Sequence, residues 1–182
     1  ALLEHRFIAA DTALAQNLDE TLKTDLFAGT GRSFIEAKLE ERDARHRKQG
    51  LRYVVEPNVK EAKGGLRDLQ SLFWIAKHIY SVEHAADLVD RGVFLEEEFK
   101  TFVAAENFLW AVRGHLHLIS GRATEQLTFD MQVAVAEAMG YRDTRGRRGV
   151  EVFMQAYFRH ATEVGELTRI FLTKLEALHV KA

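Results

Sequence analysis

Apolar residues recur along most of the chain at steps of three and four, the spacing that places them on one face of an α-helix. Two long segments of this kind cover residues 95–120 and 150–178, and residues 66–80 form a strongly apolar one. Shorter stretches with the same spacing cover residues 3–18, 84–90 and 127–139. The pattern predicts an all-α fold: one helical domain over residues 1–182, a bundle of about six or seven helices with one extended loop segment.

Capping and stop signals set the ends of several predicted helices. Ser33 followed by Glu36 forms a capping-box pattern, which predicts the start of the second helix. That helix is expected to end in the basic run 42–48 before Gly50, because basic residues in a last turn followed by glycine are a common helix stop. Residues 52–55 are predicted to be a short extended piece that leads to the chain's only proline.

Composition and charge narrow the class of protein. Of the 182 residues, 47% are apolar and 29% charged, as in an ordinary soluble globular protein. The chain has 25 basic and 27 acidic residues, a balance that argues against a dedicated DNA or RNA binder. The absence of cysteine excludes disulfides, thiolate zinc sites and cysteine nucleophiles, and it suits a reducing cytoplasm.

The beginning of the chain carries no targeting signal. Charges at Glu4 and Arg6 interrupt any signal peptide, and no apolar run approaches the roughly 18 residues that span a bilayer. The chain lacks an initiator methionine and starts inside a predicted helix. We therefore expect a piece of a longer cytoplasmic protein that does not enter a membrane.

Several catalytic signatures are missing from the sequence. It contains no P-loop, no Asp-x-Asp pair for two-metal chemistry and no adjacent His-Asp pair. Glu41 and Asp43, the run Glu96–Glu98, and His115 with His117 lie on predicted helices, where residues two apart point about 200° away from each other. We therefore expect no catalytic residue and no metal site in this chain, and the fragment alone is predicted to be inactive.

The charged loop before the strongly apolar helix is the best candidate for a binding site. Lys60, Lys63 and Arg67 place three cations within eight residues, and arginine can hold a phosphate with two hydrogen bonds. Gly64 and Gly65 allow positive φ and a close approach of the backbone to a ligand. Unpaired N–H groups at the start of the next helix would favour an anion.

The same loop has a purely structural interpretation. Asp68 could cap the first helical turn, orient Arg67 or contact a metal held by another domain. Alternatively, Glu56 and Asp68 could pair with the basic residues of the loop and simply stabilise a turn. The pattern alone leaves both interpretations open.

A second polar stripe follows the long predicted helix. Four residues at helical spacing form it: Glu106, Trp110, Arg113 and His117. Arg113 is expected either in a buried ion pair, with Asp68 or Asp130 as partner, or facing a nucleotide. The basic segments 42–48 and 142–148 are expected to be solvated loops, the second of them mobile, or to meet an acidic partner or a neighbouring domain.

Four segments resemble the central helical region of bacterial PII uridylyltransferase/uridylyl-removing enzymes. The most specific is EPNVKEAKGGLRDL, residues 56–69. The others are residues 108–118, residues 127–132 with 140–143, and residues 150–161. The Gly-Gly-Leu-Arg-Asp core is also similar to an element of glutamine synthetase adenylyltransferases, but the other three segments favour the PII enzymes.

The resemblance implies a role within a larger enzyme. Members of the family have a preceding nucleotidyltransferase domain, this helical region, an HD phosphohydrolase domain and ACT domains. They transfer UMP from UTP to the nitrogen-signalling protein PII with Mg²⁺, and remove it again. The resemblance implies that neither UTP nor Mg²⁺ is bound by this chain alone, and that PII and the two adjacent catalytic domains are its partners.

The resemblance also assigns a role to the charged loop. Its cations and glycines would approach the nucleotide triphosphate or the transferase domain, with Asp68 organising them. The residues concerned are Lys60, Lys63, Gly64, Gly65, Arg67, Asp68 and, on the long helix, Arg113. Two alternatives stay open: a scaffold that docks PII or relays glutamine sensing between domains, and the equivalent region of a glutamine synthetase adenylyltransferase.

Overall fold

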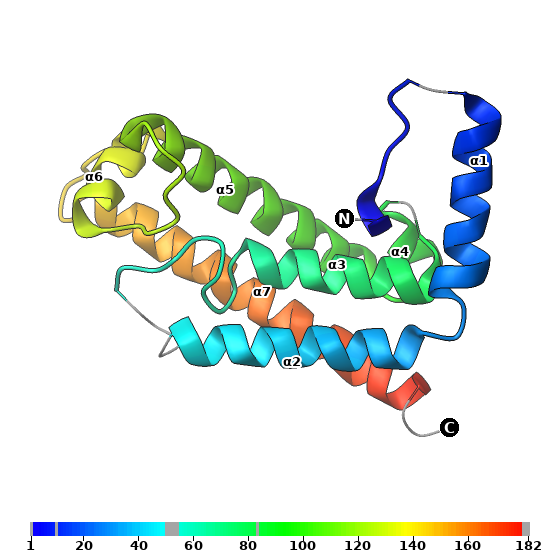
Figure 1. The fold of residues 1–182 in the computed structure, drawn as a ribbon. Helices are drawn as coiled ribbons and strands as arrows, with labels where there is room; N and C mark the ends of the chain where they lie inside the picture. Colours follow the sequence, from blue (N-terminus) through cyan, green and yellow to red (C-terminus); the bar gives the residue numbers. More distant parts are fainter. Residues whose placement is uncertain (1, 10, 50–54, 83, 180–182) are drawn as a thin grey trace.

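The computed structural model describes residues 2–9, 11–49, 55–82 and 84–179, which form an all-helical structure (Figure 1). Within these ranges there are seven α-helices and no strand, which confirms the predicted fold class. Two isolated bridges pair Asn58 with Gln126 and Thr144 with Arg147. The elements in chain order are η1 (Leu2–Glu4), α1 (Thr12–Thr21), the π-helical segment η2 (Leu22–Phe27), α2 (Gly31–Gln49), α3 (Leu66–Tyr80), α4 (Asp87–Asp90), α5 (Glu96–Ser120), α6 (Phe129–Ala138) and α7 (Gly149–His179).

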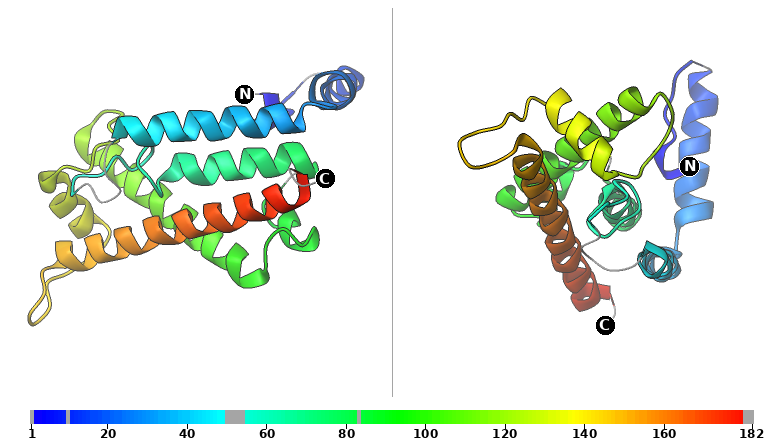
Figure 2. Two further views of the ribbon diagram at one scale, coloured as in Figure 1. Left: turned by 90° about the horizontal axis from the view of Figure 1, so that it is seen from below. Right: turned by 90° about the vertical axis from the view of Figure 1, so that its left-hand side faces the viewer.

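The core lies where α3, α5 and α7 meet. Helix α2 runs beside α3, α6 closes one end of the bundle against α5 and α7, and α1 stands away at the opposite end (Figures 1 and 2). Each of the three central helices buries one apolar face, as their three- and four-residue spacing predicts. Representative buried residues are Leu69, Leu72 and Ile75 of α3, Phe102, Leu109 and Leu116 of α5, and Phe153, Leu167 and Phe171 of α7.

The ends of the central helices follow from local capping. The backbone N–H of Leu95 donates to the Glu98 carboxylate at 2.8 Å, which fixes the start of α5, and Gly121 with φ of +66° ends it. Helix α3 occupies the predicted residues 66–80 and ends at Ser81, which adopts φ of +51°. These boundaries lie within one residue of the predictions because strong local signals mark both ends.

The predicted helix over residues 3–18 is wrong. Only residues 2–4 form a short 3₁₀ turn, and α1 begins after Asp11, whose carboxylate accepts from the N–H groups of Ala13 and Leu14. The apolar positions that suggested a longer helix are largely exposed in this chain, since Phe7 is 54% exposed and Leu14 66% exposed. The N-cap at Asp11 therefore determined the helix start.

The start of α2 also differs from the prediction. Thr30 occupies the capping position, because its carbonyl accepts from the Phe34 N–H at 2.9 Å. Ser33 lies inside the helix and donates to that same carbonyl, while Glu36 pairs with Arg32 instead of completing a capping box. Gly50 and residues 52–54, where a helix stop and an extended piece were predicted, lie outside the described residues.

Two predicted helices are shorter than expected. The segment 84–90 contains only one helical turn, α4, preceded by turn residues, and it ends before Gly92 with φ of +67°. Helix α6 begins at Phe129 with Thr128 at its N-cap position, two residues after the predicted start. The basic segment 42–48 forms the last turns of α2, which confirms the prediction that this helix ends in the basic run.

Candidate functional site

The charged loop between Pro57 and Gly65 folds around Asn58. The Asn58 side-chain oxygen accepts from the N–H groups of Lys60 at 3.1 Å and Glu61 at 2.7 Å. Its backbone carbonyl accepts from Ala62 at 3.0 Å. Asparagine favours such turns because its short side chain replaces a backbone acceptor. The loop is therefore ordered by its own sequence before it touches the helices.

One end of the loop is joined to the segment that follows α5. The Val59 N–H donates to the Glu125 carbonyl at 2.8 Å, and the Leu127 N–H donates to the Pro57 carbonyl at 2.9 Å. Val59 and Leu127 are both fully buried. These contacts connect residues nearly seventy positions apart, so the loop position depends on the whole bundle.

The first turn of α3 does not offer unpaired N–H groups. Leu66 donates to the Val59 carbonyl at 3.1 Å, Arg67 to the Lys60 carbonyl at 2.9 Å, and Asp68 to the Gly65 carbonyl at 3.0 Å. The loop thus folds back over the helix start and satisfies the donors that a helix N-terminus leaves open. The expectation that these N–H groups face an anion is wrong, because the loop itself accepts from them.

Both loop glycines are required by the chain's own packing. Gly64 adopts φ of +76°, and a Cβ there would lie 2.0 Å from the Ala161 carbonyl oxygen of α7. At Gly65 a Cβ would lie 2.8–2.9 Å from three carbonyl oxygens of the loop. The close approach predicted for these glycines occurs, but the partner is α7 and the loop backbone.

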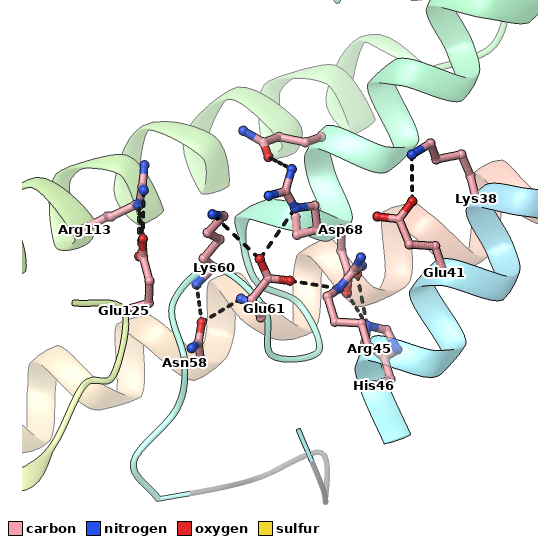
Figure 3. A network of polar contacts seen from close by, with 12 residues as sticks. Lys38, Glu41, Arg45, His46, Asn58, Lys60, Glu61, Asp68, Arg113 and Glu125 are labelled. Atoms are coloured by element: carbon pink, nitrogen blue, oxygen red, sulfur yellow. Dashed lines mark hydrogen bonds and ion pairs between the residues drawn. The ribbon is translucent and has the colours of Figure 1, made fainter. Parts of the chain in front are cut away.

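Asp68 is the buried centre of the site and is only 2% exposed (Figure 3). Its carboxylate accepts from Arg45 at 2.6 Å, from His46 Nε2 at 3.0 Å and from the Gly64 N–H at 2.9 Å. Arg45 and His46 come from the last turns of α2. The contact therefore ties α2, the loop and α3 together, and it matches the expectation that Asp68 organises the loop.

The electrostatics of this cluster favour the ionised carboxylate. Burial by itself would raise the pKa of Asp68, but the hydrogen bond and charge of His46, the Gly64 N–H and Arg45 outweigh it and hold the pKa below its ordinary value. Arg45 and His46 were expected to be solvated; instead both side chains are more than nine-tenths buried. The sequence signal that could have revealed them is Asp68 itself, a carboxylate on the buried face of an apolar helix that needs partners.

Lys60 and Arg67 lie around a different carboxylate, Glu61. The Lys60 ammonium is 3.8 Å and the Arg67 Nε 3.6 Å from the Glu61 carboxylate, which is also 3.6 Å from Arg45 Nε. Arg67 further donates to the Gln70 side chain at 3.2 Å and lies 5.4 Å from the centre of the Trp74 ring. Both cations stay partly exposed, so they can meet a partner at the surface.

Arg113 forms an ion pair, which was one of the two alternatives predicted for it. Its guanidinium donates to both oxygens of Glu125 at 2.8–3.1 Å and lies 5.1 Å from the Trp110 ring centre. The Glu125 hydrogen bond raises the pKa of Arg113, and the pKa of Glu125 is lowered because Arg113 outweighs its partial burial. The predicted partners, Asp68 and Asp130, were wrong. The partner is Glu125, which follows the end of α5.

The predicted site residues therefore fall on separate surfaces. Lys63, Gly64 and Asp68 line a cavity of about 310 Å³ between α2 and α7. Arg67 lines a second cavity of about 390 Å³ with Lys38, Glu61 and Trp74. Arg113 belongs to neither of these two cavities.

The second basic segment, 142–148, forms a turn held by its own contacts. Thr144 and Arg147 exchange backbone hydrogen bonds, Arg142 donates to the Glu137 carbonyl at 2.9 Å, and Asp143 accepts from the Gly149 N–H at 2.7 Å.

In the described ranges, no three His, Asp or Glu side chains converge as metal ligands would. Among the described helices, none is both long and apolar enough to cross a membrane.

Comparison with known proteins supports the resemblance seen in the sequence. A family model described as GlnD PII-uridylyltransferase matches residues 33–172. The chain is 71% identical over 181 residues to the bifunctional uridylyltransferase/uridylyl-removing enzyme of Ruegeria pomeroyi and 66% identical over 182 residues to that of Cereibacter sphaeroides. Each match covers 100% of this chain and 20% of the relative, so the chain spans about a fifth of their length. No solved structure matches the chain.

Proposed function

The chain belongs to the GlnD PII-uridylyltransferase family, and we propose that it forms the helical region that follows the nucleotidyltransferase domain of such an enzyme and completes its site. In this role it supports the transfer of UMP from UTP to PII in the cytoplasm. Mg²⁺ and UTP would be held mainly by the preceding domain, and an HD domain would follow. The reaction itself would need carboxylates from outside this chain.

The observation that carries this proposal is a row of partly exposed cations on one side of the bundle. Lys60, Arg67 and Arg113 come from the loop, α3 and α5, and each lies beside a carboxylate. Figure 3 labels Lys60 with Glu61 and Arg113 with Glu125. Cations held close to a phosphoryl group stabilise the charge that develops on it during transfer. The buried residues of the loop, α3 and α5 hold these cations in position.

Arg67 is the cation best placed to exchange its present contacts for a phosphate. Its Nη1 donates to the neutral amide of Gln70, and its Nε lies 3.6 Å from Glu61, which is longer than a hydrogen bond. Arg113, in contrast, is already held by two short bonds to Glu125. We therefore assign the nucleotide contact to Arg67 and Lys60, and a contact with the adjacent domain to Arg113.

The remaining predicted residues shape the loop in this proposal. Gly64 and Gly65 allow the loop to lie against α7 and over the start of α3. Asp68 links the loop to α2 through Arg45 and His46. Lys63 is exposed on the opposite side of the loop, where it lines the cavity beside α7.

The experiment is UMP transfer to PII by the full-length enzyme carrying Arg67→Ala. Losing one charge-assisted contact in the transition state should lower kcat/KM about 10- to 100-fold. Arg32→Ala is the matched control, because Arg32 is a highly exposed arginine on α2 that pairs only with Glu36 among the described residues. Near-normal transfer by a correctly folded Arg67→Ala enzyme would refute the nucleotide contact.

A further inference from the structure

A cavity of about 310 Å³ lies on the side of the loop away from Lys60 and Arg67. The last turns of α2, the loop at Lys63 and Gly64, and the middle of α7 enclose it. Its α7 wall consists of Phe158, Ala161, Thr162, Gly165 and Arg169. The cavity lies entirely within this chain, so it does not depend on the role proposed for UMP transfer.

Cations from three separate segments line this cavity. Arg42 comes from α2, Lys63 from the loop and Arg169 from α7. The carboxylates that line it are Asp43 and Asp68. The Asp68 oxygens already accept from Arg45, His46 and Gly64, so its charge is compensated from behind the cavity wall. Asp43 lies 4.0 Å from Arg42, and Glu166 pairs with Arg169, which leaves Lys63 as the charge in excess. The cavity therefore favours an anion over a cation.

Two of the three cations keep donors that the chain does not use. Arg42 Nε is buried and has no hydrogen-bond partner among the described residues; its nearest Asp68 oxygen is 3.9 Å away. The terminal nitrogens of Arg42 are not buried and form no hydrogen bond within the described residues, since the nearest Asp43 oxygen is 4.0 Å away, so they can donate to a bound acceptor. Lys63 is exposed and forms no ion pair within the described ranges. Arg169 is already paired with Glu166, so it adds charge more than a new hydrogen bond.

The residues that line the cavity include small side chains and one that is held in place. Gly64, Ala161 and Gly165 contribute little side-chain bulk, and His46 is held in place by Asp68. The volume is at the lower end of the range for small-molecule sites and corresponds to roughly ten waters of bulk liquid. Such a space fits one compact oxyanion with a small substituent.

We propose that this cavity binds the phosphate group of a small ligand. The Arg42 guanidinium would donate through its terminal nitrogens, with Lys63 as a point charge and Arg169 adding to the positive field. A phosphate has oxygens on all sides, so it can accept from donors that approach from three segments at once. The shared chemistry is a phosphate group, whether as inorganic phosphate or as a phosphate monoester such as UMP.

The proposal can be tested on the 182-residue chain itself, which has its own hydrophobic core. Inorganic phosphate and UMP are titrated separately, at constant ionic strength set with chloride, while the amide resonances of Gly64 and Gly165 are followed by NMR. Both ligands or one of them should give saturable shifts at these two glycines. Equal dissociation constants identify the phosphate group alone as the ligand, whereas at least tenfold tighter UMP binding identifies a monoester.

Variants make the test specific. Arg42→Gln should raise the dissociation constant about tenfold or more, since a charged donor is lost, and Lys63→Gln should raise it several-fold. Arg32→Gln and Lys100→Gln are matched controls with exposed side chains away from the cavity, and they should leave binding unchanged. Lys63 is exposed, so its variant keeps the test valid if Arg42→Gln does not fold.

Two results would overturn the proposal. The first is the absence of saturable shifts at Gly64 and Gly165 with either ligand beyond those that chloride causes. The second is unchanged binding in both Arg42→Gln and Lys63→Gln. Neither result bears on Arg67, and loss of UMP transfer in Arg67→Ala would not reveal this site, so the two proposals can fail separately.

Discussion

The two ends of the loop between Pro57 and Gly65 are held by different kinds of interaction. The first end is joined to residues 125–127 by backbone hydrogen bonds, beside the partly exposed ion pair of Arg113 and Glu125. The second end depends on Asp68, a buried carboxylate whose partners come from α2 and the loop. We therefore expect the bridge to residues 125–127 to tolerate the loss of a side chain and the Asp68 cluster to be destabilised when one charge is removed.

The difference follows from solvent access. At the Asp68 cluster the side chains of Asp68, Arg45 and His46 are at most 9% exposed, so water compensates poorly for a lost partner and the remaining charges stay buried. At the Arg113–Glu125 pair water reaches both side chains and the backbone bonds remain. The loop is therefore more sensitive to changes beside α2 and α7 than to changes beside α5.

The largest expected effect is that of Asp68→Asn. The substitution leaves Arg45 and His46 buried without their counter-charge, and we expect it to lower the free energy of unfolding by about 3–5 kcal/mol. Urea unfolding followed by circular dichroism measures this. Asp43→Asn is the control, since Asp43 is exposed and should change stability by less than about 0.5 kcal/mol. Equal stability of the two variants would contradict a dominant role for burial.

Gly64→Ala should come second. Its methyl group would meet the Ala161 carbonyl, and its backbone would be strained at positive φ. Gly121→Ala carries a similar positive φ with open space around the Cβ, so it isolates the conformational strain. Thermal unfolding should show Gly64→Ala to be about 1–3 kcal/mol less stable than Gly121→Ala. Similar values would mean that the loop can move away from α7.

The Arg113–Glu125 pair should contribute less. A double-mutant cycle with Arg113→Gln and Glu125→Gln should give a coupling of about 1 kcal/mol, because the pair is bidentate but partly solvated. The same cycle on the more exposed Arg169–Glu166 pair should give about 0–0.5 kcal/mol. A coupling near 3 kcal/mol at Glu125 would remove the contrast with Asp68.

The smallest effect is a difference in acid sensitivity. Asp68 and Glu125 both have a pKa below their ordinary values of 3.8 and 4.5, so the native state binds fewer protons there than the unfolded state. Each carboxylate contributes stability that is fully present above its ordinary pKa and is lost as the pH falls through the lowered value. Below about pH 4, stability should therefore fall less steeply in Asp68→Asn than in the original chain, as unfolding at several pH values would show.

The sequence predicted those parts of the fold that depend on local signals. The boundaries of α3 and α5 agreed because a glycine or a charged cap marks them. At the N-terminus an apolar spacing suggested a helix through residues 3–18, but its apolar positions do not pack on the bundle and Asp11 sets the start. Apolar spacing locates a helix only where another element buries the apolar face.

The candidate site was predicted less completely, because its contacts join distant segments. Local spacing identified the charged loop and both glycines, but it could not show that Arg45 and His46 reach Asp68 across 22–23 residues. It offered an ion pair as one of two alternatives for Arg113 but missed the partner Glu125, which lies beyond the end of the same helix. The division of the cations among separate surfaces depends on tertiary packing alone.

The close approach of Gly64 to Ala161 makes the loop a point about which α7 could tilt. A helix of thirty-one residues is a rod about 46 Å long, and Ala161 lies about 18 Å from its beginning and 27 Å from its end. A tilt of about 5° around this point would move the far end by about 2 Å. Because Gly64 also donates to Asp68, we expect a displacement of α7 at this point to be felt by the loop and by α3.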